Sequence, residues 1–279
     1  MTIPSQTPAA ISPATSAPAA VRVGVSHREM VRTVNNVIAK FPESLRGQSI
    51  MSDRFAFHVE LIANRIGTDV RVADVGSGWG TVPLACAAIG MKAVIVDDEG
   101  DPGHSDDSAV AGMNALYAAY GVERVIQDVV ANGFDFPAGS LDAVTSFDFF
   151  EHVHNSPRRF AREAVAALRP GGLFIIGVPN CVNLRKRITV PFGFGKWSSM
   201  EEWYDIDVFR GHVREPDVDD LRYIARDLGL KNVEIIGRNW KGYYTRFSLV
   251  RRLTPLADRL LRLRPSLCSD IYMVGVKAS

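Results

Sequence analysis

The feature that most constrains this chain is a glycine-rich turn between an apolar strand and an apolar helix. Residues 72–75 read Val-Ala-Asp-Val, and Gly76, Gly78 and Gly80 follow them at once. Glycines at such a turn let the backbone approach a ligand closely, because no side chain stands in the way. A helical pattern then begins at Thr81. The turn therefore predicts the first strand–turn–helix unit of an α/β sheet with a ligand site at its edge.

Strands and helices alternate along the rest of the chain. Short apolar runs predict further strands at 93–96, 124–127, 143–147, 173–178, 233–236 and 271–276. Helical spacing of apolar residues predicts helices at 81–89, 108–120, 157–168 and 217–228, with two more ahead of the turn at 27–40 and 53–66. Strands joined by such helices form right-handed crossovers. The fold class is therefore α/β, with a parallel sheet covered on both faces.

The chain is long enough for one large domain. Its 279 residues are 47% hydrophobic, which allows a full core. Residues 1–22 begin with an Ala-, Pro-, Ser- and Thr-rich stretch without a basic leader, so we expect a disordered tail and not a signal peptide. We expect a single domain over 23–279. The aromatic, glycine-rich segment 180–216 interrupts the alternation and is predicted to form an inserted cap.

An acidic residue at the end of the second strand narrows the ligand class. Asp97 lies about 20 positions beyond Gly76, where a carboxylate binds ribose hydroxyls in dinucleotide-binding folds. The third glycine comes one residue early for G-x-G-x-x-G, which disfavours a nicotinamide dehydrogenase. Together with Asp-Val-Val at 128–130 and Arg-Pro-Gly-Gly at 169–172, this block resembles the class I S-adenosylmethionine-dependent methyltransferases. The likeness is strongest over 72–178.

The resemblance implies a Rossmann-like, doubly wound sheet of seven strands whose last strand is antiparallel. It implies S-adenosylmethionine as cofactor, with Asp97 on the ribose, Asp128 on the adenine amino group and Asp74 orienting the glycine turn. The complete set of expected cofactor residues is Asp74, Gly76, Ser77, Gly78, Trp79, Gly80, Asp97, Asp98, Asp128, Val129 and Phe147. Trp79 departs from the small residue often found at its position, and packing at the helix start is the alternative.

Methyl transfer requires alignment of the acceptor and removal of its proton. Asp148, Glu151, His152 and His154 follow the fourth strand, beside the expected cofactor. Asp148, Glu151 and His152 are spaced so that one helical turn would bring them together, and we expect them to hold Mg²⁺. This arrangement resembles the Glu-x-x-Glu-His of metal-assisted quinone O-methyltransferases. The alternative is a metal-free site in which Glu151, His152 or His154 removes the proton.

The cap supplies a further candidate. His212 is expected to fold back over the pocket as a second base or metal ligand, and a purely structural loop histidine is the alternative. Aromatic residues of the cap are candidate platforms for a sugar, although they also suit a small core of the cap itself; they are Trp197, Trp203, Tyr204 and Phe209.

These features favour an O-methyltransferase acting on a sugar or oligosaccharide, with actinobacterial polysaccharide methyltransferases as the nearest likeness. A phenolic, quinone or natural-product acceptor is the main alternative, and a cofactor-binding module without activity is a second. The net charge of +1 gives no reason to expect nucleic acid binding.

A basic amphipathic segment lies near the C-terminus. Between residues 246 and 264, leucines recur at helical spacing among arginines. We expect this helix to pack on the domain or in a homodimer, and peripheral contact with an anionic membrane is the alternative. No apolar run is long enough to span a bilayer. Three scattered cysteines are typical of a reducing compartment, and we expect a cytoplasmic protein.

Overall fold

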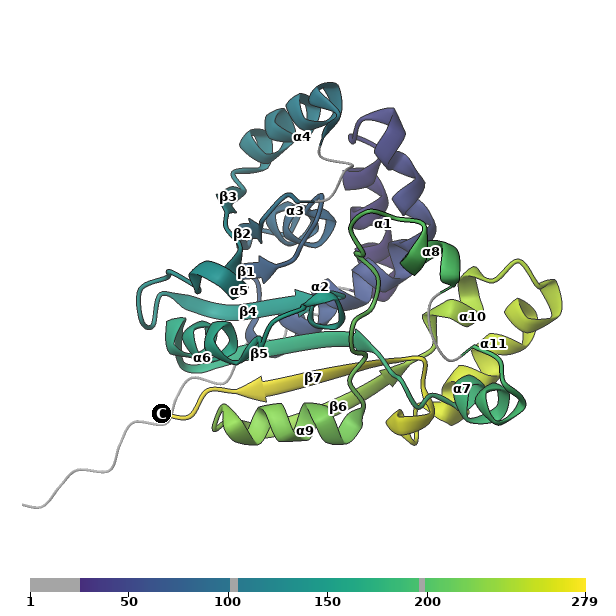
Figure 1. The fold of residues 1–279 in the computed structure, drawn as a ribbon. Helices are drawn as coiled ribbons and strands as arrows, with labels where there is room; N and C mark the ends of the chain where they lie inside the picture. The colour runs from purple at the N-terminus through teal and green to yellow at the C-terminus, as the bar shows by residue number, and fades with distance from the viewer. Residues whose placement is uncertain (1–25, 101–104, 196–198) are drawn as a thin grey trace, which may run out of the picture.

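A seven-stranded sheet with helices on both faces forms the body of the molecule (Figure 1). The computed structural model describes residues 26–100, 105–195 and 199–279, so the expected tail at 1–22 lies outside them. The strands are β1 (Arg71–Val75), β2 (Lys92–Asp97), β3 (Glu123–Ile126), β4 (Leu141–Phe147), β5 (Leu168–Pro179), β6 (Lys231–Arg238) and β7 (Asp270–Val276). Their order is β3-β2-β1-β4-β5-β7-β6, and β7 is antiparallel to both neighbours. The predicted fold class is confirmed.

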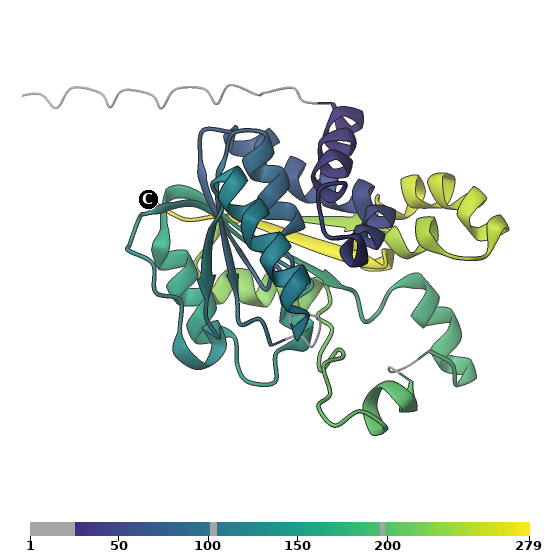
Figure 2. The same ribbon diagram turned by 90° about the horizontal axis from the view of Figure 1, so that it is seen from above.

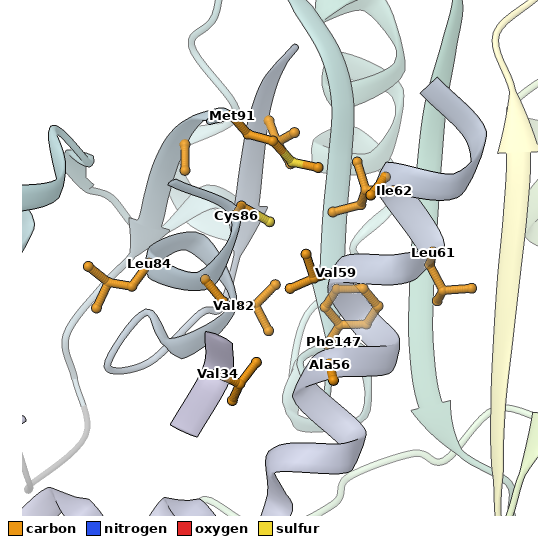
Figure 3. Close-up of a cluster of buried hydrophobic side chains, with 14 of the residues drawn as sticks. Val34, Ala56, Val59, Leu61, Ile62, Val82, Leu84, Cys86, Met91 and Phe147 are labelled. Atoms are coloured by element: carbon orange, nitrogen blue, oxygen red, sulfur yellow. The ribbon is translucent and has the colours of Figure 1, made fainter. Parts of the chain in front are cut away.

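Four helices cover one face of the sheet: α1 (His27–Ile38), α2 (Ser52–Ile66), α3 (Thr81–Ala88) and α4 (Asp107–Tyr120). A 3₁₀ helix, η1 (Glu43–Met51), connects α1 to α2. α1 begins where Ser26 and Glu29 form a reciprocal capping box, which satisfies free backbone N–H groups. Val34 of α1, Val59 and Ile62 of α2 and Cys86 of α3 lie in one apolar cluster (Figure 3). Burial of these side chains fixes the N-terminal helices onto the sheet.

The opposite face carries α5 (Val129–Asn132), α6 (Arg158–Ala167) and α9 (Val218–Asp227). Phe160 of α6 and Leu221 of α9 are fully buried in a second apolar cluster with Phe174 and Ile176 of β5. Alternate residues of β5 therefore enter opposite cores, as expected of a strand covered on both sides.

The Pro-Gly-Gly segment belongs to β5, although the predicted strand began only at residue 173. Residues 169–172 lie within β5, where the register against β4 shifts between Leu141 and Ala143. Gly171 has φ +78°, and Gly171 and Gly172 exchange backbone hydrogen bonds with Lys277 after β7. The segment is a bulge that continues the strand, because its backbone groups find partners on β7.

The segment that we predicted as a cap projects from the end of the sheet where β4 and β5 finish (Figure 2). It contains α7 (Leu184–Thr189), η4 (Val190–Phe192) and α8 (Met200–Tyr204). Trp197 lies outside the described residues. The chain returns from this segment to the body at Asp217, whose side chain caps α9.

Two further helices, α10 (Trp240–Tyr244) and α11 (Ser248–Leu261), connect β6 to η5 (Pro265–Leu267) and β7. α11 is the expected basic amphipathic helix, but the expectation that its leucines pack on the domain is wrong. Leu249, Leu253, Leu256 and Leu260 are all more than half exposed. Thr254 and Asp258 face the protein instead, because α11 contacts the body through its polar side. Within the described residues, no helix has the length and apolar character needed to cross a bilayer.

Candidate active site

The glycine turn lies between β1 and α3, at the edge where the parallel strands end. Gly76, Gly78 and Gly80 all have positive φ angles, of +68°, +51° and +67°. A Cβ atom on Gly76 would lie 2.4 Å from the Phe149 ring, and one on Gly80 would lie 2.4 Å from Ile95. A Cβ on Gly78 would meet nothing within 4 Å. The protein itself therefore fills the space beside two of these glycines, and the third faces open space where a ligand fits.

Asp97 connects the end of β2 to this turn. Its Oδ2 accepts a hydrogen bond of 2.8 Å from the backbone N–H of Gly78, and its Oδ1 accepts one from the N–H of Glu99. Asp98 is exposed, and its Oδ1 accepts from the N–H of Gly100. The structure thus places Asp97 against the glycine turn and Asp98 in the solvent-facing loop that follows.

Asp74 is buried behind the turn. Thr145 of β4 donates a hydrogen bond of 2.6 Å to its carboxyl group. Burial raises the pKa of Asp74 to about 7, against the hydrogen bond from Thr145, and the charges of Asp97 and Asp148 raise it further. Asp74 therefore braces β1 against β4 beneath the loop.

The remaining expected cofactor residues occupy varied positions. Ser77 lies in the turn, where its buried Oγ has no hydrogen-bond partner among the described residues. Trp79 packs against the apolar core beside α3. Asp128 caps α5 by accepting from the N–H groups of Val130 and Ala131, and Val129 is buried behind it.

Phe147 lies at the end of β4 but faces the core below α2. Its ring stacks on that of His58, with centroids 3.9 Å apart and an interplanar angle of 6°. His58 is 1% exposed and is therefore a packed core histidine, and burial lowers its pKa well below the usual value. Phe149, which the sequence analysis missed, is the aromatic residue that lies against the glycine turn.

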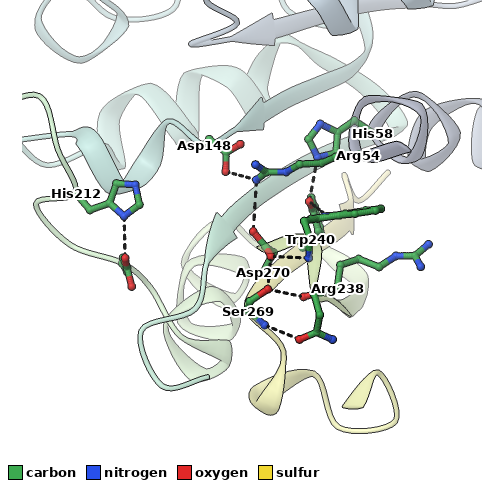
Figure 4. Close-up of polar contacts among 11 residues, drawn as sticks. Arg54, His58, Asp148, His212, Arg238, Trp240, Ser269 and Asp270 are labelled. Atoms are coloured by element: carbon green, nitrogen blue, oxygen red, sulfur yellow. Dashed lines mark hydrogen bonds and ion pairs between the residues drawn. The ribbon is translucent and has the colours of Figure 1, made fainter. Parts of the chain in front are cut away.

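Asp148 does not share a helical turn with Glu151 and His152, contrary to the expected spacing. Its φ of +55° places it in the left-handed region, so the chain reverses before the short helix η3 (Phe150–His152) begins. Its carboxylate instead forms an ion pair of 2.5 Å with Arg54 of α2 (Figure 4). Arg54 also lies 3.6 Å from Asp270 of β7.

A buried polar network supports Arg54, and the sequence analysis found none of it. Burial lowers the pKa of Arg54, but Tyr272, Asp148 and Asp270 outweigh burial and raise it above its ordinary value. Trp240 Nε1 donates to the Tyr272 hydroxyl at 2.8 Å, and that hydroxyl lies 3.0 Å from His58 Nε2. The backbone N–H of Trp240 also donates to Asp270 (Figure 4). One sequence feature could have indicated this network, namely that two polar residues, Arg54 and His58, lie one turn apart on an apolar helix.

The structure brings Glu151, His152 and His212 together. One possible ligand atom from each residue lies within 4.8 Å of the others. The rings of His152 and His212 meet edge to face, with centroids 4.9 Å apart. Glu151 is 1% exposed, and neither of its carboxylate oxygens has a hydrogen-bond partner among the described residues. Its backbone carbonyl accepts from Val213 and Arg214, which holds the cap segment against η3.

Hydrogen bonds fix the tautomers of both histidines. His152 Nδ1 lies 2.7 Å from the Arg210 carbonyl, which can only accept, so Nδ1 carries a proton and Nε2 keeps its lone pair. Burial lowers the pKa of His152 against that hydrogen bond and favours this neutral form. His212 Nδ1 donates to Glu215 at 2.8 Å, and Lys186 of α7 pairs with the same carboxylate. His212 therefore also presents Nε2.

The charge state of the two carboxyl groups differs. Burial raises the pKa of Glu215, but hydrogen bonds from His212 and Lys186 outweigh it and lower the pKa to about 2. Burial and the nearby Asp148 raise the pKa of Glu151 to about 8. Glu215 is therefore ionised and Glu151 mainly protonated at neutral pH.

His154 lies apart from this cluster. Its side chain is exposed and lines a separate hollow with Pro157 of the α6 start and Tyr223 of α9. The structure gives it no contact with the His152–His212 pair.

His152 and His212 line a cavity of about 1400 Å³ beneath the cap segment, whereas Glu151 is buried and is not part of the lining. The lining combines apolar surface with polar and charged side chains, which include Asn183, Arg185, Lys186, Glu202, Asp207, Arg210, His212 and Glu215. Arg210 also reaches the loop after β2, where its guanidinium would lie 3.2 Å from a Cβ on Gly100. The cap segment thus spans from the catalytic candidates to the cofactor side.

Comparison with known protein families gives a match over most of this fold. A family described as "Methyltransferase domain" matches residues 44–235. The match begins in η1 and ends in β6, so it includes the glycine turn, Asp97, the Glu151–His152 pair and the cap segment.

Curated relatives are similar over part of their length. A "Probable S-adenosylmethionine-dependent methyltransferase" of Mycobacterium tuberculosis is 31% identical over 169 residues, which are 61% of this chain and 51% of that protein. A "Ubiquinone biosynthesis O-methyltransferase" of Xanthomonas campestris is 29% identical over 44% of this chain and 48% of its own. The chain thus spans about half the length of these relatives.

Among solved structures, a phosphoethanolamine N-methyltransferase of Haemonchus contortus, in complex with phosphomonomethylethanolamine and S-adenosylhomocysteine, has the same fold. The TM-score is 0.54 at 18% identity, over 91% of this chain and 61% of that one.

Proposed function

The chain belongs to the methyltransferase domain family, and we propose that it is an S-adenosylmethionine-dependent O-methyltransferase that methylates a hydroxyl group of a sugar or oligosaccharide. The observation that carries this proposal is that His152 and His212 line a large cavity and that the buried Glu151 lies beside them. This cluster adjoins the strand edge at which the glycine turn and Asp97 lie. The proposed base, the acceptor cavity and the strand edge that would bind the cofactor, here called the cofactor edge, therefore lie next to one another.

The residues at the cofactor edge fit S-adenosylmethionine. The cofactor supplies an electrophilic methyl group on a sulfonium. Gly78 leaves open space beside the backbone, the carboxylate of Asp97 lies against the same turn at the end of β2, and Asp128 lies on the neighbouring loop. We propose that Asp97 binds the ribose diol and that Asp128 faces the adenine.

We propose His212 as the general base. Glu215 holds its Nδ1 proton, so Nε2 is ready to accept the proton of an acceptor hydroxyl. Glu215 is ionised and lies 2.8 Å away, and it therefore stabilises the imidazolium that forms. His152 Nε2 is a second acceptor, and it can receive a hydrogen bond from a neighbouring hydroxyl of the sugar. Burial and the charge of Asp148 raise the pKa of Glu151, which favours its protonated form, so we do not assign Glu151 as the base.

The cluster fits Mg²⁺ poorly. Magnesium prefers six oxygen ligands, whereas this cluster offers two imidazoles and a single carboxyl group, and Asp148 is paired with Arg54. Two histidines and a carboxylate suit a borderline ion such as Zn²⁺ or Mn²⁺ better. The proton transfer to His212 needs no metal, so we expect turnover to survive dialysis against EDTA. A loss that Mg²⁺ restores would instead support the metal-assisted alternative.

The polar and charged side chains among the cavity's lining residues support a sugar, because a hydroxyl-rich acceptor needs many hydrogen-bond partners. A phenolic or quinol acceptor is the second candidate, and the likeness to a protein named for ubiquinone biosynthesis favours it. Transfer of labelled methyl from S-adenosylmethionine to matched panels of sugars and phenols separates the two. Methylation of sugars supports the first proposal, and methylation restricted to phenols overturns it. Binding of S-adenosylhomocysteine without transfer to either panel would favour a module without activity.

A further inference from the structure

The leucines of α11 form one continuous exposed stripe. Leu249, Leu253, Leu256 and Leu260 alternate in steps of four and three residues, which places them on one side of the helix, and Leu263 follows in the turn after its end. Their side chains are between 53% and 83% exposed. Exposed apolar area of this extent mostly marks an interaction surface, because water solvates it poorly. We call these five residues the leucine stripe.

The residues around the leucine stripe are basic. Arg246, Arg251, Arg252, Arg259, Arg262 and Arg264 surround it, and Lys241 lies on α10. The acidic residue of the segment from 240 to 264 is Asp258, which is 3% exposed. Its carboxylate accepts from Asn239 and pairs with Arg262, so it faces inward. The exposed charged residues of α11 are therefore all basic.

We propose that α11 docks on an anionic lipid bilayer, with the leucine stripe in the acyl region and the arginines at the headgroups. Apolar insertion combined with positive charge at the flanks is the chemistry by which amphipathic helices bind such surfaces. A second copy of this chain fits less well. In a two-fold pair of α11 helices, Arg252 and Arg259 would flank the seam on both copies without an acidic partner.

The position of α11 in the fold makes such docking sterically feasible. α10 and α11 project from the body at the end that also carries the cap segment, in both views (Figures 1 and 2). Lys241 of α10 lines the large cavity, so the docking helix lies beside the acceptor side of the molecule. The bilayer would then lie near the cavity and away from α6 and α9 on the opposite face.

Flotation of the full chain with vesicles tests the proposal without any activity measurement. We expect binding to phosphatidylcholine vesicles that contain phosphatidylglycerol, little binding to phosphatidylcholine alone, and release at high salt. The double variant Leu256→Ser with Leu260→Ser should weaken binding at least about tenfold. Arg252→Glu with Arg259→Glu should weaken it through charge alone. Thermal unfolding of each variant should match the original chain, because all four side chains are exposed.

Matched controls come from α9 on the other side of the sheet. Tyr223 is 65% exposed, as is Leu256, and Arg226 is an exposed arginine, so Tyr223→Ser and Arg226→Glu should leave vesicle binding unchanged. Equal loss in these controls, or no binding to anionic vesicles, overturns the proposal. So does a dimer in vesicle-free solution that Leu256→Ser with Leu260→Ser separates, because the stripe would then belong to a second copy.

Discussion

The two sides of the proposed site are built in different ways. The cofactor edge consists of the glycine turn with Asp97, and we call the cluster of Glu151, His152 and His212 the acceptor edge. At the cofactor edge, the glycine turn and Asp97 lie on two adjacent strands, and a backbone hydrogen bond of 2.8 Å joins them. At the acceptor edge, His212 reaches Glu151 and His152 only because the cap segment folds back over η3. The first edge follows from the sheet itself, whereas the second depends on a separate element. We therefore expect that acceptor choice can change without disturbing cofactor binding.

Removing His212 should break the acceptor edge alone. We expect His212→Ala to lower kcat about 10²- to 10⁴-fold, because a general base contributes this much. The affinity for S-adenosylhomocysteine, measured by calorimetry, should be unchanged. His154→Ala is the matched control, since His154 lies in another hollow and its loss should leave turnover intact. Loss of cofactor affinity in His212→Ala would mean that the two edges are not independent.

Changing Asp97 should break the cofactor edge. An amide in place of the carboxylate keeps one acceptor for the Gly78 N–H but loses the charge that strengthens bonds to a diol. We expect Asp97→Asn to weaken S-adenosylhomocysteine binding about tenfold to hundredfold. The same change at exposed Asp98 should have little effect. Equal losses at both positions would place the ribose against the loop and not against the strand end.

The two edges also differ in how far the sequence predicts them. Gly76 to Gly80 and Asp97 follow directly from spacing, because the sheet fixes where neighbouring strands end. The placement of Glu151 and His152 after the fourth strand was predicted for the same reason. The approach of His212 was expected, but its pairing with Glu215 depends on how the cap segment packs.

Other features had no signal in local spacing. Asp148 has a positive φ, which is rare outside glycine, so its turn toward Arg54 was not predictable from a helical repeat. The leucines of α11 show the period of a packed helix, and periodicity does not say whether a partner covers the apolar side.

Alanine at two glycines of the turn should separate packing from ligand binding. In Gly80→Ala the new Cβ would meet Ile95 at 2.4 Å, so we expect about 2–3 kcal/mol lower stability in urea unfolding. In Gly78→Ala the space is open, and the positive φ alone should lower stability by about 1–2 kcal/mol. Gly78→Ala should nevertheless weaken S-adenosylhomocysteine binding more than its stability loss explains. Full cofactor affinity in that variant would show that no ligand enters beside Gly78.

Asp74 at the cofactor edge and Glu151 at the acceptor edge are buried acids, and we expect each to change how the free energy of unfolding depends on pH. This is the smallest of the expected effects. The pKa of Asp74 is raised to about 7 and that of Glu151 to about 8, so the folded state binds more protons than the unfolded chain. Their contribution to the free energy of unfolding is present at low pH and is lost as pH rises through these values. Above about pH 7, only Glu151 should still change the free energy of unfolding, by about 1 kcal/mol per pH unit.

Glu151→Gln should therefore flatten the upper part of the curve of stability against pH and Asp74→Asn the lower part, as measured by urea unfolding across this range. An unchanged curve in Glu151→Gln would mean that Glu151 is ionised in the folded protein, and Glu151 would then be a base or metal ligand after all.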